Sequence, residues 1–190
     1  NPGHCRRHGA HGGNACRGAG DAGVEGHGRG GILTAITLRR ADFTDAALIQ
    51  SLLEEQAAHH DEALEAGVEA LEKWGFGPKA LFRVIVAERA GQALGFALYY
   101  PDFSTLRGRP GVMLQDIYVR EAARGLGLGR ALLAEVMQAA TDWDAAFLTL
   151  MLDRTTDAAR AFYSKAGFSA RGDYDMLILE GEGLSALMTP

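Results

Sequence analysis

The chain has 190 residues, 47% of them hydrophobic, which is enough for one well-cored domain but too few for two large ones. The net charge of −5 becomes −7 when residues 1–31 are left out, because they hold four arginines and two acids and leave 15 basic and 22 acidic residues. Such an acidic body is a poor partner for nucleic-acid phosphates and suits a cationic amine better. We find no membrane span or secretory signal and therefore expect a soluble, cytoplasmic protein.

Residues 1–31 differ in composition from the rest of the chain. They contain 11 of the 25 glycines and only one larger aliphatic residue, Val24, so we expect a disordered tail followed by one domain over 32–190. Both cysteines, Cys5 and Cys16, lie in this tail with four of the six histidines, but their spacing matches no usual zinc template. We therefore expect no metal site, and neither a disulfide nor a thiol nucleophile in the domain.

The hydrophobic patterns along residues 32–190 predict helices alternating with strands, an α/β domain. In chain order the expected elements are a strand over 35–39, helices over 44–60 and 63–74, strands over 82–89 and 93–100 joined by a turn at 90–92, a strand over 112–119, a helix over 129–141, a strand over 147–152, a helix over 156–165 and a closing strand over 176–180.

The stretch LQDIYVREAARGLGLGRALL, residues 114–133, runs from a strand through a glycine-rich turn into a helix. Gly125, Gly127 and Gly129 mark the switch, and residues without Cβ let a ligand approach the main chain. The first N–H groups of the helix have no partner within it, and together with the helix dipole they suit a phosphate. The pattern favours an anion-binding turn, and a turn kept only for close packing is the alternative.

Two common nucleotide motifs do not fit this turn. A Walker A loop needs Gly-Lys-Ser/Thr, which is absent, and Gly125 to Gly129 reads G-x-G-x-G rather than the dinucleotide fingerprint G-x-G-x-x-G. What remains is Arg124-x-x-Gly127-x-Gly129, which resembles the pyrophosphate-binding motif of the GCN5-related N-acetyltransferase (GNAT) family. The resemblance implies a GNAT fold, a mixed central sheet flanked by helices, in which acetyl-CoA enters where two strands splay apart.

A second pattern in the correct order strengthens the resemblance. Thr156-x-x-Ala159-x-x-x-Tyr163-x-x-x-Gly167-Phe168 is similar to the family signature Asn-x-x-Ala-x-x-x-Tyr-x-x-x-Gly-Phe, with threonine where asparagine is usual. Residues four apart share one helix face, so Ala159 and Tyr163 lie together. By resemblance, a tyrosine near the coenzyme A sulfur protonates the leaving thiolate, which is general-acid chemistry. An ordinary half-buried core tyrosine is the alternative.

A narrower similarity links GFG (75–77), GFALYYPDF (95–103) and LQDIYV (114–119) to the diamine and thialysine acetyltransferase branch. That branch acetylates primary amines and carries Leu-Glu-Asp before the turn, whereas this chain has Leu114-Gln115-Asp116. Asp116 matches, but Gln115 has no charge with which to attract an ammonium group. The resemblance also implies a homodimer.

We assign expected roles on this basis. An alkylammonium with a pKa of about 10 must lose a proton before it attacks the thioester. Asp116, directly or through water, is the candidate base beside Tyr163 as the acid, and an exposed or structurally paired aspartate is the alternative. The expected substrate-binding residues are Gln115, Asp116, Glu62 and Tyr100, although Glu62 also fits a solvated helix end. The expected acetyl-CoA-binding residues are Ile117, Tyr118, Val119, Arg124, Gly125, Leu126, Gly127, Leu128, Gly129, Arg130, Thr156, Ala159, Phe162 and Tyr163. Arg124 either contacts a phosphate or braces the turn.

The expected function is therefore acetyl-CoA-dependent N-acetylation of a small-molecule primary amine, a diamine, polyamine or lysine-like amine, by direct attack on the thioester. A catalytically silent acyl-CoA-binding module is the alternative from another class, and Gln115 and Thr156 keep it open. A protein-lysine or N-terminal amine is a further possible acceptor.

Overall fold

A five-stranded sheet organises the protein in the computed structural model, which describes residues 35–172 and 176–188. The predicted tail, 1–31, lies outside the described residues. The strands are β1 (Thr37–Arg40), β2 (Arg83–Arg89), β3 (Gln92–Ser104), β4 (Arg109–Val119) and β5 (Leu148–Leu150), and they lie side by side in that order. Strands β1 to β4 pair antiparallel and β5 joins β4 in parallel, so the sheet is mixed as expected.

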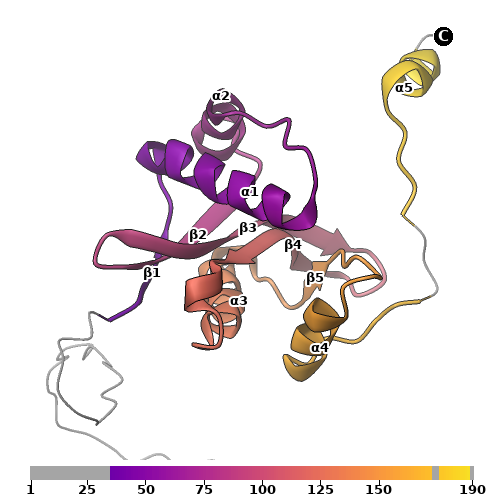
Figure 1. Ribbon diagram of the computed structural model, residues 1–190. Helices are drawn as coiled ribbons and strands as arrows, with labels where there is room; N and C mark the ends of the chain where they lie inside the picture. The colour runs from indigo at the N-terminus through magenta and orange to yellow at the C-terminus, as the bar shows by residue number, and fades with distance from the viewer. Residues whose placement is uncertain (1–34, 173–175, 189–190) are drawn as a thin grey trace, which may run out of the picture. The chain divides into compact units, whose positions relative to one another are not determined.

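Helices cover both faces of the sheet (Figure 1). The first face carries α1 (Ala46–His60) and α2 (Val68–Leu71), which continues as a π-helical turn, Glu72–Phe76; the second carries α3 (Leu128–Ala139) and α4 (Asp157–Lys165). Alternate residues of a strand point to opposite faces, so each strand contributes to two cores. Val84 and Val86 of β2 pack with α1, whereas Ile85 and Ala87 pack with α3.

Several predicted elements have different limits in the structure. The helix predicted over 63–74 begins only at Val68, because the chain turns through left-handed Asp61 (φ 57°) and is extended at Gly67. Strands β3 and β4 are longer than predicted and form one hairpin that turns near Gly108. The predicted strand over 176–180 is wrong: these residues form no strand, and an unpredicted helix, α5 (Gly181–Met188), follows them.

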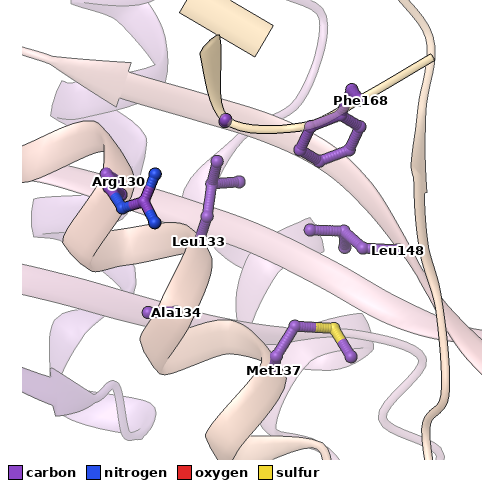
Figure 2. Close-up of a pocket in the computed structure, with 7 residues that line it drawn as sticks. Arg130, Leu133, Ala134, Met137, Leu148 and Phe168 are labelled. Atoms are coloured by element: carbon purple, nitrogen blue, oxygen red, sulfur yellow. The ribbon is translucent and has the colours of Figure 1, made fainter. Parts of the chain in front are cut away.

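A pocket of about 260 Å³ lies beside the outermost strand (Figure 2). Arg130, Leu133, Ala134 and Met137 of α3 form one wall. The rest of the lining comes from β5 and from the residues that follow α4, namely Leu148, Ala166 and Phe168. Apart from Arg130, every lining side chain is apolar, so the pocket is a gap in the packing of the second face rather than a polar site.

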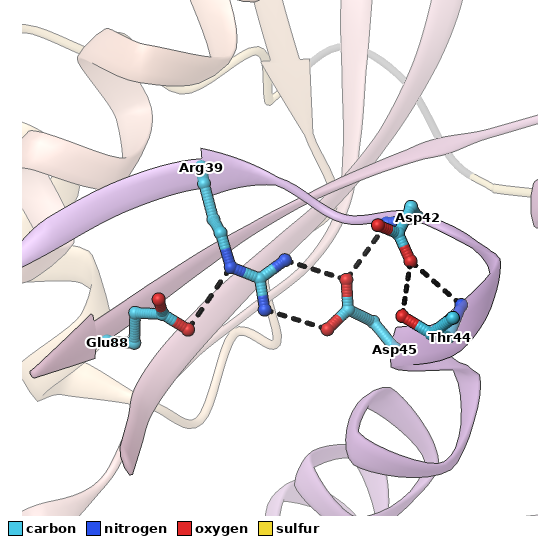
Figure 3. A network of polar contacts seen from close by, with 5 residues as sticks. All are labelled: Arg39, Asp42, Thr44, Asp45 and Glu88. Atoms are coloured by element: carbon cyan, nitrogen blue, oxygen red, sulfur yellow. Dashed lines mark hydrogen bonds and ion pairs between the residues drawn. The ribbon is translucent and has the colours of Figure 1, made fainter. Parts of the chain in front are cut away.

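An ion-pair network fixes the start of α1 to the sheet (Figure 3). Arg39 of β1 donates to both carboxylate oxygens of Asp45 at 2.7 Å, and its Nε donates to Glu88 of β2 at 3.1 Å. Asp45 also accepts from the backbone N–H of Asp42, at 2.9 Å. The Arg39 guanidinium holds the pKa of Asp45 below its usual value even though burial opposes the shift.

Within residues 35–172 and 176–188, no helix is long and apolar enough to cross a membrane.

Candidate active site

Strands β4 and β5 separate after a short parallel pairing. Only Val112, Met113 and Leu114 of β4 pair with β5, opposite Leu148–Leu150. Beyond Leu114, β4 continues to Val119 with β3 on one edge and, among the described residues, no strand on the other. The predicted cofactor-binding residues are Ile117, Tyr118 and Val119. Among the described residues, no strand pairs with the backbone N–H and C=O groups on their outer edge, as expected where two strands splay apart.

The glycine turn that follows β4 has the open backbone of an anion-binding loop. Gly125 (φ 80°) and Gly127 (φ 76°) both adopt the left-handed region, and a Cβ on either would meet nothing within 4 Å. The helical hydrogen bonds of α3 begin with Ala131, whose backbone N–H donates to the carbonyl of Gly127 at 3.1 Å. The amides of Leu128, Gly129 and Arg130 precede it and are the orphan donors of the helix. These residues fit a pyrophosphate.

Gly129 needs to be glycine for a different reason from Gly125 and Gly127. A Cβ there would lie 3.0 Å from Cζ of Phe162, so the missing side chain lets α3 and α4 pack closely. Phe162, expected to bind cofactor, is thus a packing partner of the turn. Leu128 is buried and faces the core, whereas Leu126 is 56% exposed at the tip. The close-packing alternative therefore applies to Gly129 but not to the open Gly125 and Gly127.

Arg124 braces the turn in this structure. Its Nε donates to the carbonyl of Val119 at 3.1 Å, which ties the turn back to the end of β4. One of its terminal nitrogens lies 3.4 Å from Nε2 of His59, at the end of α1. Of the two roles considered from the sequence, bracing has direct geometric support. The contact with His59 was not foreseen.

A β-bulge directs the Asp116 side chain. Asp116 pairs with Leu98 and Leu114 with Tyr99, so Gln115 is an extra residue in β4. Leu114 packs in the core beneath α3, and without the bulge Asp116 would point the same way. The extra residue reverses the alternation and turns the carboxylate toward α1, an established use of bulges.

Two polar groups from outside β4 act on the Asp116 carboxylate, Gln56 of α1 and Glu62 of the loop that follows α1. The side-chain amide of Gln56, on α1, donates to Oδ1 of Asp116 at 3.1 Å. Burial raises the pKa of Asp116, the hydrogen bond from Gln56 lowers it, and the negative charge of nearby Glu62 raises it further. A carboxylate whose pKa is raised is a stronger base, which suits proton removal from an ammonium group.

Gln56 was missed in the sequence analysis. The signal was present, because Ile49, Leu52 and Leu53 form the buried stripe of α1 and Gln56 continues that stripe at helical spacing. A polar residue on an apolar stripe needs a partner, and Asp116 supplies it. The predicted substrate residues Tyr100 and Gln115 also meet, with the tyrosine hydroxyl donating to Oε1 of Gln115 at 3.4 Å.

Tyr163 lies on α4 between two aromatic rings. Its ring contacts those of Phe162 and Phe168 edge-on, with centroids 5.0 and 5.4 Å away. Burial raises the pKa of its hydroxyl, so the group stays protonated at neutral pH. Thr156 occupies the N-cap position of α4 without a capping hydrogen bond from its side chain, and Ala159 is half-buried one turn before Tyr163.

The comparisons with known proteins agree with this geometry. The model of the acetyltransferase (GNAT) family matches residues 46–168, from the first residue of α1 to Phe168. This chain belongs to the GNAT family. It is an N-acetyltransferase, and the matched region contains the glycine turn, the bulge at Gln115 and the α4 tyrosine of this GNAT domain.

Curated relatives include a thialysine N-epsilon-acetyltransferase of Bos taurus, 30% identical over 80% of this chain and 96% of its own length. A spermidine/spermine N(1)-acetyltransferase-like protein 1 of Homo sapiens is 29% identical over 68% of this chain and 20% of its own. Among solved structures, an integron cassette protein from the mobile metagenome of V. cholerae has a TM-score of 0.67 at 24% identity, covering 82% of this GNAT chain and 98% of its own. At this identity the similarity shows the fold.

Proposed function

We propose that this GNAT protein transfers the acetyl group of acetyl-CoA to the primary amine of a small molecule. The observation that carries the proposal is the environment of Asp116. This half-buried carboxylate accepts a hydrogen bond from Gln56, and the negative charge of Glu62 raises its pKa. Two acidic side chains near one point favour a cationic amine, and the acidic domain adds to that preference. The printed names of relatives, thialysine and spermidine/spermine acetyltransferases, support the same acceptor class.

In this proposal the glycine turn binds the cofactor. The open backbone at Gly125 and Gly127 and the orphan amides at the start of α3 would hold the pyrophosphate. The end of β4, Ile117 to Val119, has no neighbouring strand on its outer edge among the described residues, and its backbone groups there would form hydrogen bonds with the pantetheine arm. Bound in this way, acetyl-CoA supplies the thioester carbonyl next to the amine, and positioning provides a large part of the rate.

The chemical steps need one base and one acid. The substrate ammonium gives a proton to Asp116, directly or through water, and its lone pair then attacks the thioester carbonyl carbon. As the new C–N bond forms, the C–S bond breaks and the thiolate takes the hydroxyl proton of Tyr163. The second proton of the nitrogen passes to solvent, which leaves a neutral amide and free coenzyme A thiol. Asp116 then releases its proton and Tyr163 takes one up, both by exchange with solvent, so that one proton is released in total and the enzyme is restored.

Release of coenzyme A thiol tests the proposal. The full chain is incubated with acetyl-CoA and each of a panel: diamines, polyamines, thialysine, free amino acids and a lysine peptide. We expect amine-dependent thiol release, fastest with a diamine, a polyamine or thialysine, and a product mass increased by one acetyl group. Fastest turnover of the peptide would replace the small-amine proposal by a protein substrate. Tight acetyl-CoA binding without turnover of any amine would favour a silent binding module.

A further inference from the structure

His59 reaches from the end of α1 to the arginine that precedes the glycine turn. Its Nε2 lies 3.4 Å from a terminal nitrogen of Arg124. A guanidinium has N–H donors and no acceptor, so a hydrogen bond here requires an unprotonated Nε2, and a neutral imidazole then carries its proton on Nδ1. His59 is therefore the acceptor, and the contact joins residues that are 65 positions apart in the sequence.

Two further contacts hold the end of α1 against the end of β4. Glu55 accepts hydrogen bonds from two nitrogens of Arg120, at 2.8 and 2.5 Å, and Gln56 donates to Asp116 at 3.1 Å. An arginine that binds both oxygens of a carboxylate fixes the relative orientation of the two groups. The last turns of α1 therefore keep a defined position beside β4, and His59, one turn beyond Glu55, extends from a fixed support.

The glycine turn needs a support of this kind. Gly125 and Gly127 have left-handed φ values and open surroundings. Glycine loses more conformational freedom on ordering than any other residue, and a loop that is ordered before its ligand arrives binds that ligand more tightly. The bond from Arg124 to Val119 reaches only five positions back along the chain, whereas the bond to His59 ties the turn to a separate helix.

We propose that His59 is a positioning residue for cofactor binding: its neutral imidazole holds the Arg124 guanidinium and so orders the glycine turn before the pyrophosphate binds. The inference rests on the cofactor site of the proposed function but not on which amine is acetylated. The role differs from that of a cation for phosphate, because the imidazole acts as an acceptor and is uncharged in this contact. A protonated ring would face the guanidinium as a second positive charge.

The Kd of acetyl-CoA, measured by calorimetry on the full chain at about pH 8, where histidine side chains are ordinarily neutral, tests this role. His59→Phe keeps a ring and removes the acceptor, and we expect Kd to rise about three- to tenfold, the range for one lost hydrogen bond. His59→Gln should restore most of the affinity, because its amide oxygen accepts, whereas His59→Lys should not. His60→Phe is the matched control: its ring meets that of His59 edge-on at 5.3 Å, and Kd should stay unchanged.

A double-mutant cycle with Arg124→Ala shows whether His59 acts through this arginine. Once the guanidinium is absent, His59→Phe should raise Kd no further. The same rise in both backgrounds would overturn the proposal, as would restoration by lysine in place of glutamine, which would make His59 a cation for phosphate. Equal Kd values for the unmodified chain and His59→Phe would overturn this inference alone. Failure of the unmodified chain to bind acetyl-CoA would overturn the proposed cofactor site as well.

Discussion

The side-chain amide of Gln56 donates a hydrogen bond of 3.1 Å to Oδ1 of Asp116, joining α1 to the bulged end of β4. The contact stabilises the carboxylate form of Asp116 and so works against burial, which raises its pKa. Gln56 therefore acts as a positioning residue for the proposed base: it aims the carboxylate and adjusts its basicity. The amide oxygen of Gln56, Oε1, is buried without a hydrogen-bond partner, so this side chain bears a desolvation cost that its bond to Asp116 helps to offset.

Replacing Gln56 by leucine is expected to move the acidic limb of the pH profile of kcat/KM toward higher pH. Without the donor, the charged form of Asp116 loses a hydrogen bond and its pKa rises, so a higher pH is needed to ionise the base. Gln50→Leu is the matched control, because Gln50 lies on the same helix but donates to Ala66 and Glu54. An unchanged limb in Gln56→Leu would mean that another group is the base.

Replacing Glu62 by glutamine is expected to move the same limb in the opposite direction. The negative charge of Glu62 raises the pKa of Asp116, so its removal lets the carboxylate ionise at lower pH. If Glu62 also attracts the ammonium group, KM for the amine should increase several-fold, and added salt should reduce the difference. Glu65→Gln, a change on the same exposed loop, should alter neither the acidic limb of the pH profile nor KM for the amine. A shift toward higher pH in Glu62→Gln would contradict this electrostatic account.

Local patterns predicted most of the fold, whereas the contacts of the site depend on tertiary geometry. Helix α3 was predicted nearly at its observed limits because its apolar spacing is strong and a glycine turn precedes it. The bulge at Gln115 was not predicted, because nothing in LQDIYV distinguishes an extra residue from a regular one. That single residue decides which face Asp116 occupies, and so it also brings Gln56 to the carboxylate.

The error at residues 176–180 has a different origin. Their apolar, β-favouring sequence is typical of a strand, but a strand exists only when another strand supplies its hydrogen bonds. Among residues 35–172 and 176–188, no strand pairs with the segment, and no local pattern contains that information. The helix predicted over 63–74 begins late for a local reason, since left-handed Asp61 and extended Gly67 interrupt the helical path before Val68.

Tyr163→Phe is expected to lower kcat about 100-fold or more, the usual contribution of a general acid, while KM for acetyl-CoA changes little. The fold should remain, because phenylalanine keeps the edge-on ring contacts with Phe162 and Phe168. Tyr100→Phe is the control hydroxyl deletion at the proposed substrate site and should act mainly on KM for the amine. Stopped-flow measurement of thiol release tests both variants. Full activity in Tyr163→Phe would return this residue to the role of a core tyrosine.

Gly127→Ala is expected to weaken acetyl-CoA binding and to lower stability by about 1–2 kcal/mol, because a side chain at φ 76° is strained. Gly91→Ala, in the turn between β2 and β3, is a closely matched control: its φ is 75° and a Cβ there also meets nothing within 4 Å. Both variants should lose similar stability in chemical denaturation. Only Gly127→Ala should raise Kd for acetyl-CoA in calorimetry, and equal Kd values would remove the turn from the cofactor site.

Asp45→Asn is expected to destabilise the fold by about 2 kcal/mol at pH 7, since asparagine keeps one acceptor without the charge and faces Arg39 with a second donor, at a side chain only 9% exposed. The pKa of Asp45 is lower in the folded than in the unfolded state, so its contribution is complete above the unfolded pKa. It is lost as the pH falls through the folded pKa. Denaturant unfolding of both proteins from pH 7 to pH 2 should therefore show two stability curves that converge in acid. Asp142→Asn, which breaks the Arg83 pair at a 55% exposed carboxylate, should cost less at pH 7. If the stability curves of the unmodified protein and Asp45→Asn stay parallel, the lost stability comes from packing rather than from the charge of Asp45.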